Sequence, residues 1–188
     1  MGLLLVSTHP IYAEDSPAFE KIRDVSPDGK FALRISCSSE PENPDDIDSS
    51  LITAVDVVSL PSKKVVVNVG EEGTPPHLIW SEDSKWFAFP FSEGHRVTYT
   101  RVYHLSGDDF VSMVRENEEL LVPIKGNVRN EYVTPVRWLK PGVLLLEQQD
   151  ILRGGEGKDV YYRFTVKFGE QPGSFHIVSK KKVPPPKE

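Results

Sequence analysis

Carboxylates are the residues of this chain whose number and placement most suggest chemistry. The 188 residues include 28 Asp and Glu against 22 Lys and Arg, a formal net charge of -6. Five of the acids lie within residues 38–50, a polar segment with two prolines that we expect to be a loop. Grouped loop carboxylates attract cations and basic partners, although such a group is more commonly a solvated surface.

Motifs for known catalytic and metal chemistry are absent from the sequence. It has no Gly-x-Ser-x-Gly elbow, no His-Glu-x-x-His or Cys-x-x-Cys pair and no phosphate-binding loop. Its five histidines lack metal-ligand spacing. The aspartates Asp45, Asp46 and Asp48 lack the spacing and the glycine of an EF-hand. We therefore predict neither a metal site nor a cofactor.

Charge and hydropathy narrow the class of protein. A net charge of -6 and an isoelectric point of about 5.4 argue against nonspecific binding to nucleic acid or to an anionic membrane surface. No stretch approaches the roughly 18 apolar residues of a membrane span. The single cysteine, Cys37, cannot form an internal disulfide and lies in a strand-like run. We expect it to be a small buried apolar residue.

Residues 1–13 resemble a clipped export signal. Leu3 to Val6 form a short apolar core, and Ile11-Tyr12-Ala13 precedes two acids as a signal-peptidase site would. However, no Lys or Arg precedes the core, and the core is short. Export predicts a periplasmic or secreted protein. If residues 1–13 are instead an ordinary terminus, the protein is cytoplasmic.

Alternating apolar residues and short turns predict an all-β chain. Turns rich in Pro, Gly, Ser and Asp separate runs rich in Val, Ile and aromatic residues. Strands are expected at residues 20–25, 31–37, 51–60, 65–69, 77–80, 86–91, 96–105, 110–114, 132–139, 143–149, 159–168 and 174–179. A helix over 110–121 is an alternative, because Val111, Val114 and Leu121 fit helical spacing. Residues 180–188, basic and proline-rich, are expected to form an extended, solvated tail.

The turn motif repeats along the chain. Ser26, Asp28 and Lys30 recur 55 residues later as Ser81, Asp83 and Lys85, and Trp80 recurs 58 residues later as Trp138. The predicted strands then fall into three repeats of four antiparallel strands, at about 20–69, 77–131 and 132–179, within one domain of residues 14–179. A four-stranded repeat with a period near 50 is typical of β-propeller blades.

The repeated motif resembles that of a known family. Residues 25–33, VSPDGKFAL, resemble the SPDG-K-x-A blade motif of TolB-like propellers, which also occur as the propeller domains of prolyl oligopeptidases. Residues 80–89 are similar, with Glu and Ser in place of Pro and Gly, whereas residues 138–142 keep only the Trp and the Gly. The resemblance implies propeller-like blades without the hydrolase domain. Three blades are fewer than the 4 to 8 of a closed ring. The blades are therefore expected to stay open, to pack on another protein or to be completed by dimerisation.

In such a fold, the connections between the second and third strands and those between blades lie on one face. These connections hold half of the 28 acids. They are Glu40, Glu42, Asp45, Asp46, Asp48, Glu71, Glu72, Glu93, Glu116, Glu118, Glu119, Glu131, Asp150 and Glu156. The strongest binding candidates are Asp45, Asp46, Asp48, Glu71, Glu72, Glu93 and His95.

Two functions are consistent with this pattern. The first is a non-catalytic binding or scaffold module, which contacts a protein partner or a second copy through its acidic loop face or its blade edges. The alternative is a hydrolase-like enzyme with a site in a central pocket, formed by His77 and His95 with Glu71 or Glu93.

Overall fold

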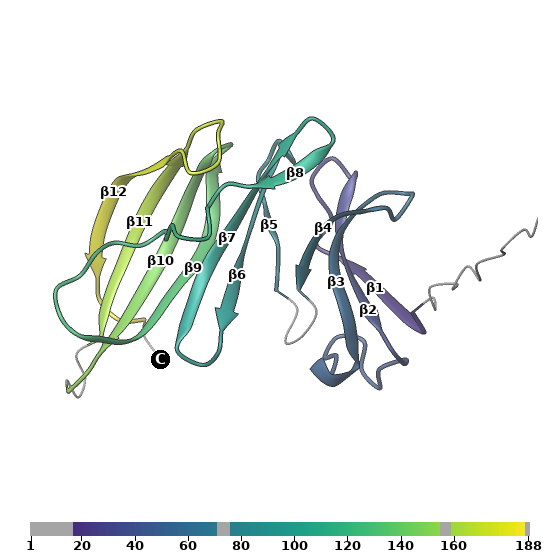
Figure 1. Ribbon diagram of the computed structural model, residues 1–188, viewed down its shortest axis with the longest axis horizontal. Helices are drawn as coiled ribbons and strands as arrows, with labels where there is room; N and C mark the ends of the chain where they lie inside the picture. The colour runs from purple at the N-terminus through teal and green to yellow at the C-terminus, as the bar shows by residue number, and fades with distance from the viewer. Residues whose placement is uncertain (1–16, 71–75, 155–158, 187–188) are drawn as a thin grey trace, which may run out of the picture.

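The computed structural model describes residues 17–70, 76–154 and 159–186, and in these ranges the chain is all-β (Figure 1). The strands form two sheets. One has four strands in the order β1-β2-β3-β4, and the other has eight, in the order β12-β11-β10-β9-β7-β6-β5 with β8 paired to β7. The predicted export signal lies outside the described residues.

The four-stranded sheet contains the first copy of the turn motif. Ser26 donates a hydrogen bond of 2.8 Å to the carboxylate of Asp28, which also accepts one of 3.1 Å from the backbone N–H of Lys30. Gly29 supplies the positive φ of 73° that closes the turn. A short 3-10 helix, Ser49–Leu51, lies at the end of the predicted 38–50 loop. The strands are β1 (Phe19–Arg23), β2 (Phe31–Cys37), β3 (Ile52–Ser59) and β4 (Val65–Gly70).

The eight-stranded sheet combines the second and third repeats. The second contributes β5 (Ile79–Trp80), β6 (Trp86–Glu93), β7 (Val97–Ser106) and β8 (Asp109–Ser112). The third contributes β9 (Val128–Lys140), β10 (Val143–Leu152), β11 (Val160–Phe168) and β12 (Phe175–Val183). They join through a short parallel ladder between β7 and β9, where Val97 lies opposite Glu131 and Thr98 opposite Tyr132.

Three separate four-stranded sheets are therefore not confirmed. β8 is short and pairs only with the last residues of β7, from Tyr103 to Ser106. β8 leaves the edge of the first half of β7 free, and β9 pairs with that edge at Val97 and Thr98. The helix considered for 110–121 does not form, because β8 is followed by irregular structure. β12 continues to Val183, so the first residues of the predicted tail belong to the sheet.

Two hydrophobic cores lie on opposite faces of β6. Phe87 and Phe89 pack towards the first sheet, whereas Trp86 and Ala88 pack towards β9–β11 and the segment after β8. Each buried aromatic side chain contributes about 1.5–3 kcal/mol to folding. All three tryptophans contribute to these cores, because Trp86 is buried and Trp80 and Trp138 pack against them. Cys37 is buried, as predicted.

The tryptophans also link each repeat to the one before it. The indole N–H of Trp80 donates to the carbonyl of Asp24 at 2.7 Å, and that of Trp138 donates to the carbonyl of Ile79 at 2.8 Å. Asp24 and Ile79 both lie two residues before the serine of their turn. The same type of hydrogen bond therefore links the second repeat to the first and the third repeat to the second.

Candidate functional site

A cavity of about 230 Å³ lies where β6, β7 and β9 meet the irregular segment that follows β8. Its lining is dominated by carboxylates. The polar residues that line it are Glu93, Tyr99, Thr100, Arg101, Arg115, Glu116, Glu118, Glu119 and Glu131. Five glutamates against two arginines give this lining a formal charge of -3. We call this cavity the acidic pocket.

One wall of the acidic pocket is irregular but firmly held. Met113, Leu120 and Val122 of this wall are buried in the core. The side-chain amide of Gln148 on β10 accepts a hydrogen bond of 2.7 Å from the N–H of Val122 and donates one of 3.0 Å to its carbonyl. Gln148 thus replaces the backbone of a neighbouring strand, which keeps these buried groups paired.

The two arginines of the pocket leave most of its acids uncompensated. The backbone N–H of Arg115 donates to Glu118 at 3.1 Å, and its guanidinium lies 3.7 Å from the same carboxylate. Arg101 stacks on the ring of Phe91, 4.6 Å from its centroid. Within the described ranges, the other acids of the pocket, Glu93, Glu116, Glu119 and Glu131, take part in no ion pair.

Tyr99 lines the pocket and is affected by three of its carboxylates. Burial raises the pKa of its phenol, and the carboxylates of Glu93, Glu119 and Glu131 raise it further because they disfavour a second anion. These three acids come from different segments of the chain. They therefore line the same cavity only in the folded protein.

A buried carboxyl lies beside Glu131. Asp150 on β10 is opposite Glu131 on β9 in the antiparallel register, so the two side chains share one face of the sheet. Asp150 is 0% exposed; its Oδ2 accepts a 2.7 Å hydrogen bond from Gln148, and its Oδ1 has no partner among the described residues. Burial raises the pKa of both carboxyls, and the charges of Asp150 and Glu119 raise that of Glu131 further.

This arrangement is suited to an organic cation. Half-buried carboxylates form strong, charge-assisted hydrogen bonds with ammonium and guanidinium groups. The face of a tyrosine ring adds a cation–π attraction. In the part of the chain that the structure describes, no group of three or more His, Cys, Asp or Glu side chains is placed to hold a metal ion.

Of the predicted binding residues that the structure describes, only Glu93 lines the acidic pocket. His95 is near it in sequence, but its contact is made by its backbone carbonyl, which accepts a hydrogen bond of 3.2 Å from the hydroxyl of Tyr132. Glu71 and Glu72 lie outside the described residues.

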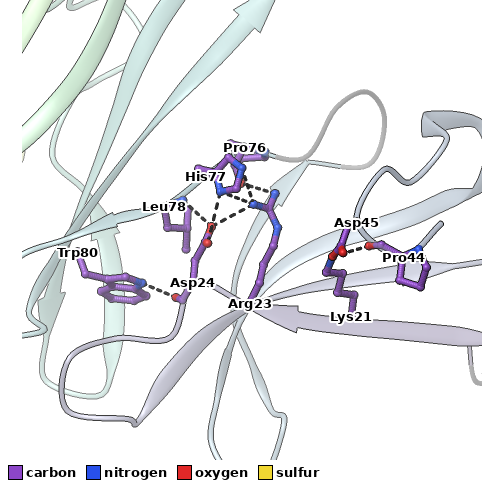
Figure 2. Close-up of polar contacts among 9 residues, drawn as sticks. All are labelled: Lys21, Arg23, Asp24, Pro44, Asp45, Pro76, His77, Leu78 and Trp80. Atoms are coloured by element: carbon purple, nitrogen blue, oxygen red, sulfur yellow. Dashed lines mark hydrogen bonds and ion pairs between the residues drawn. The ribbon is translucent and has the colours of Figure 1, made fainter.

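The predicted aspartates Asp45, Asp46 and Asp48 lie in the loop between β2 and β3, away from the pocket lining. Asp45 forms an ion pair of 2.8 Å with Lys21, whose ammonium also donates to the carbonyl of Pro44 (Figure 2). Asp48 caps the 3-10 helix by accepting from the N–H of Ser50 at 2.9 Å. Two of the three therefore have structural partners.

His77 belongs to a second polar cluster, at the junction of the first sheet with β5 (Figure 2). The carboxylate of Asp24 accepts a hydrogen bond of 2.9 Å from the N–H of Leu78 and lies 3.4 Å from the imidazole of His77. Arg23 donates to the carbonyl of Pro76 at 3.0 Å. The cluster ties the end of β1 to the chain that enters β5. His77 is not part of the acidic pocket.

Several residues of the pocket belong to the predicted acidic face but were not singled out as binding candidates. They are Glu116, Glu118, Glu119 and Glu131. Asp150, which lies opposite Glu131, belongs to the same predicted face, whereas Tyr99 of the pocket and Gln148, which supports its wall, were missed altogether. One signal was present in the sequence. Gln148 and Asp150 continue the alternation of Leu144 and Leu146, so two polar residues occupy core-facing positions.

Comparisons with known proteins identify no relative. The chain matches no protein-family model, no curated protein and no solved structure. The similarity to TolB-like propellers therefore remains a prediction from the turn motif. The described residues form no helix of the length and hydropathy needed to cross a membrane.

Proposed function

We propose that this protein is a non-catalytic binding module whose acidic pocket receives a basic side chain, lysine or arginine, of a partner protein. One observation carries the proposal. Glu93, Glu119 and Glu131 line the same cavity as Tyr99, and the lining of this cavity has a formal charge of -3.

The energetics favour a cationic occupant. Taking a carboxylate out of water costs free energy unless a counter-charge replaces the lost hydration. Glu131 is half-buried and lies opposite the fully buried Asp150, without an ion pair in the described ranges. Each charge-assisted hydrogen bond from an ammonium or guanidinium group contributes about 1.5–3 kcal/mol. Stacking on Tyr99 contributes about 0.5–2 kcal/mol more.

A protein partner fits better than a free small cation because further acids lie beyond the pocket. Figure 1 places the connection between β2 and β3 at the same end of the sheets as the connection between β6 and β7, which follows Glu93, the last residue of β6. The first of these connections contains the exposed Asp45, Asp46 and Asp48. A basic segment inserting one side chain into the pocket would be attracted by these acids, which increases its association rate.

Peptide binding tests the proposal. The probe is a fluorescein-labelled peptide with one central arginine among glycines and serines, and its control contains citrulline, which has nearly the same shape without the charge. Anisotropy at low salt is expected to show binding of the arginine peptide alone. Glu131→Gln is expected to weaken binding about tenfold, the equivalent of 1.4 kcal/mol. Glu82→Gln, in an exposed turn outside the pocket lining, is the matched control and should change nothing.

Equal binding of the arginine and citrulline peptides would overturn the proposal. So would an equal loss of affinity in the Glu131→Gln and Glu82→Gln variants, because the attraction would then come from net charge rather than from the pocket.

We also propose that the three repeats are propeller-type blades, as the turn motif predicts. Two shared features support this. Ser81 and Asp83 form the same side-chain hydrogen bond as Ser26 and Asp28. The tryptophan-to-carbonyl bond then recurs between successive repeats. Light scattering of the purified protein distinguishes an open monomer from a ring completed by a second copy.

A further inference from the structure

A carboxyl pair with poorly compensated charges lies next to the acidic pocket, and one of its two members, Glu131, lines the cavity. Glu131 and Asp150 lie opposite each other on β9 and β10 and share one face of the sheet. Asp150 is fully buried, and its Oδ1 has no hydrogen-bond partner in the described part of the chain. A bare carboxylate oxygen in this position is costly, whereas a protonated carboxyl or a nearby cation removes the cost.

The groups around this pair are mostly acidic. The segment after β8 contributes Glu119, whose charge acts on Glu131. β6 and β7 contribute Glu93, Tyr99 and Arg101, all of which line the same pocket. Gln148 on β10 donates one hydrogen bond to Asp150. Only Arg101 in this set is cationic, and it stacks on Phe91.

Two adjacent carboxyls in such surroundings, one buried and one half-buried, titrate as a unit, because ionising one disfavours ionising the other. We propose that Glu131 and Asp150 share one proton while the pocket is empty and release it when a basic side chain enters. The exchange half of this inference rests on the proposed function, whereas proton sharing in the free protein does not. The module would therefore bind its partner at neutral pH and release it in acid.

The direction of the pH dependence follows from this exchange. An entering cation favours the ionised pair, so binding lowers the pKa of the pair and releases about one proton. Below the pKa of the pair in the free protein, affinity is then expected to fall about tenfold for each unit of pH. A pocket with permanently ionised carboxylates would show no such dependence above the ordinary pKa range of Asp and Glu.

Carbon-13 NMR of the side-chain carboxyls in the free protein tests proton sharing. We expect the signals of Glu131 and Asp150 to titrate together, above the ordinary range of carboxyl pKa values. In Asp150→Asn, the pKa of Glu131 should fall, because the neighbouring charge is gone. In Glu131→Gln, the pKa of Asp150 should fall for the same reason. Independent titrations of Glu131 and Asp150 in the wild-type protein would overturn the inference. So would an unchanged pKa of the remaining carboxyl in either variant.

Calorimetry with the arginine peptide, in two buffers that differ in ionisation enthalpy, tests the exchange. Release of about one proton per bound peptide is expected in the wild-type protein. Binding without proton release overturns the exchange and leaves the proposed function intact. Conversely, coupled titration in a protein that does not bind the peptide supports proton sharing and overturns the proposed function. The two failures are therefore distinguishable.

Discussion

Replacing Asp150 with asparagine should stabilise the protein at neutral pH. Asparagine is nearly isosteric, and its side-chain oxygen can still accept the hydrogen bond that Gln148 donates to Oδ2 at 2.7 Å. The substitution replaces an ionisable carboxyl, fully buried opposite Glu131, with a neutral amide. Burying a carboxylate without a counter-charge costs more than burying a neutral amide, by roughly 1–3 kcal/mol. We therefore expect the free energy of unfolding to rise by about that amount at pH 7.5.

The stability gained by Asp150→Asn should depend on pH. Because folding raises the pKa of Asp150, ionising it destabilises the native state. This penalty is fully present above the folded-state pKa. It disappears as the pH falls below the pKa of an unfolded aspartate, about 3.9. The advantage of Asp150→Asn should therefore shrink in acid.

Urea unfolding followed by tryptophan fluorescence, at several pH values from 4 to 8, measures this difference. Asp108→Asn, at an exposed turn position, is the matched control and should leave stability unchanged at every pH. If Asp150→Asn destabilises the protein at pH 7.5, or stabilises it equally at all pH values, the buried and uncompensated charge assigned to Asp150 is wrong.

Three further predictions concern the framework around the pocket. Gln148→Leu should lower the free energy of unfolding by about 2–4 kcal/mol, because it leaves the N–H and carbonyl of Val122 unpaired; hydrogen exchange should then accelerate around Val122. Trp138→Phe should cost about 1 kcal/mol in chemical denaturation, through loss of the hydrogen bond to Ile79. Cys37 should react with a thiol reagent only after unfolding, because burial raises its pKa and hides its sulfur.

Each of these has a clear contrary result. Unchanged hydrogen exchange at Val122 in the Gln148→Leu variant would mean that the wall of the pocket does not depend on the two hydrogen bonds from Gln148. If Trp138→Phe is neutral, the indole hydrogen bond contributes nothing to the contact between repeats. Labelling of Cys37 in the native protein, at the rate found in urea, would contradict its burial.

Local patterns were sufficient to predict most strands. The SPDGK turn predicts a strand at 31–37, and β2 has those bounds. The joining of the second and third repeats was not predictable in the same way. It depends on whether β8 or β9 occupies the free edge of β7, and no local pattern sets the length of β8. Such long-range competition is decided by tertiary packing.

The pocket was only partly predictable for a related reason. Glu93 was identified because it lies in a short acidic loop. Pairing Glu131 with Asp150 requires the register of β9 against β10, and this register shifts at three irregularities, one of them between Leu145 and Leu146. Each shift changes which residues face each other, so alternation alone cannot assign the pair.

The most direct test of the central claim is to map peptide binding on the isotope-labelled protein by NMR. If the acidic pocket receives a basic side chain, the arginine peptide should shift the signals of Tyr99, Glu119 and Glu131, and the citrulline peptide should leave them unchanged. Shifts confined to the 38–50 loop, or equal shifts with both peptides, would contradict the account.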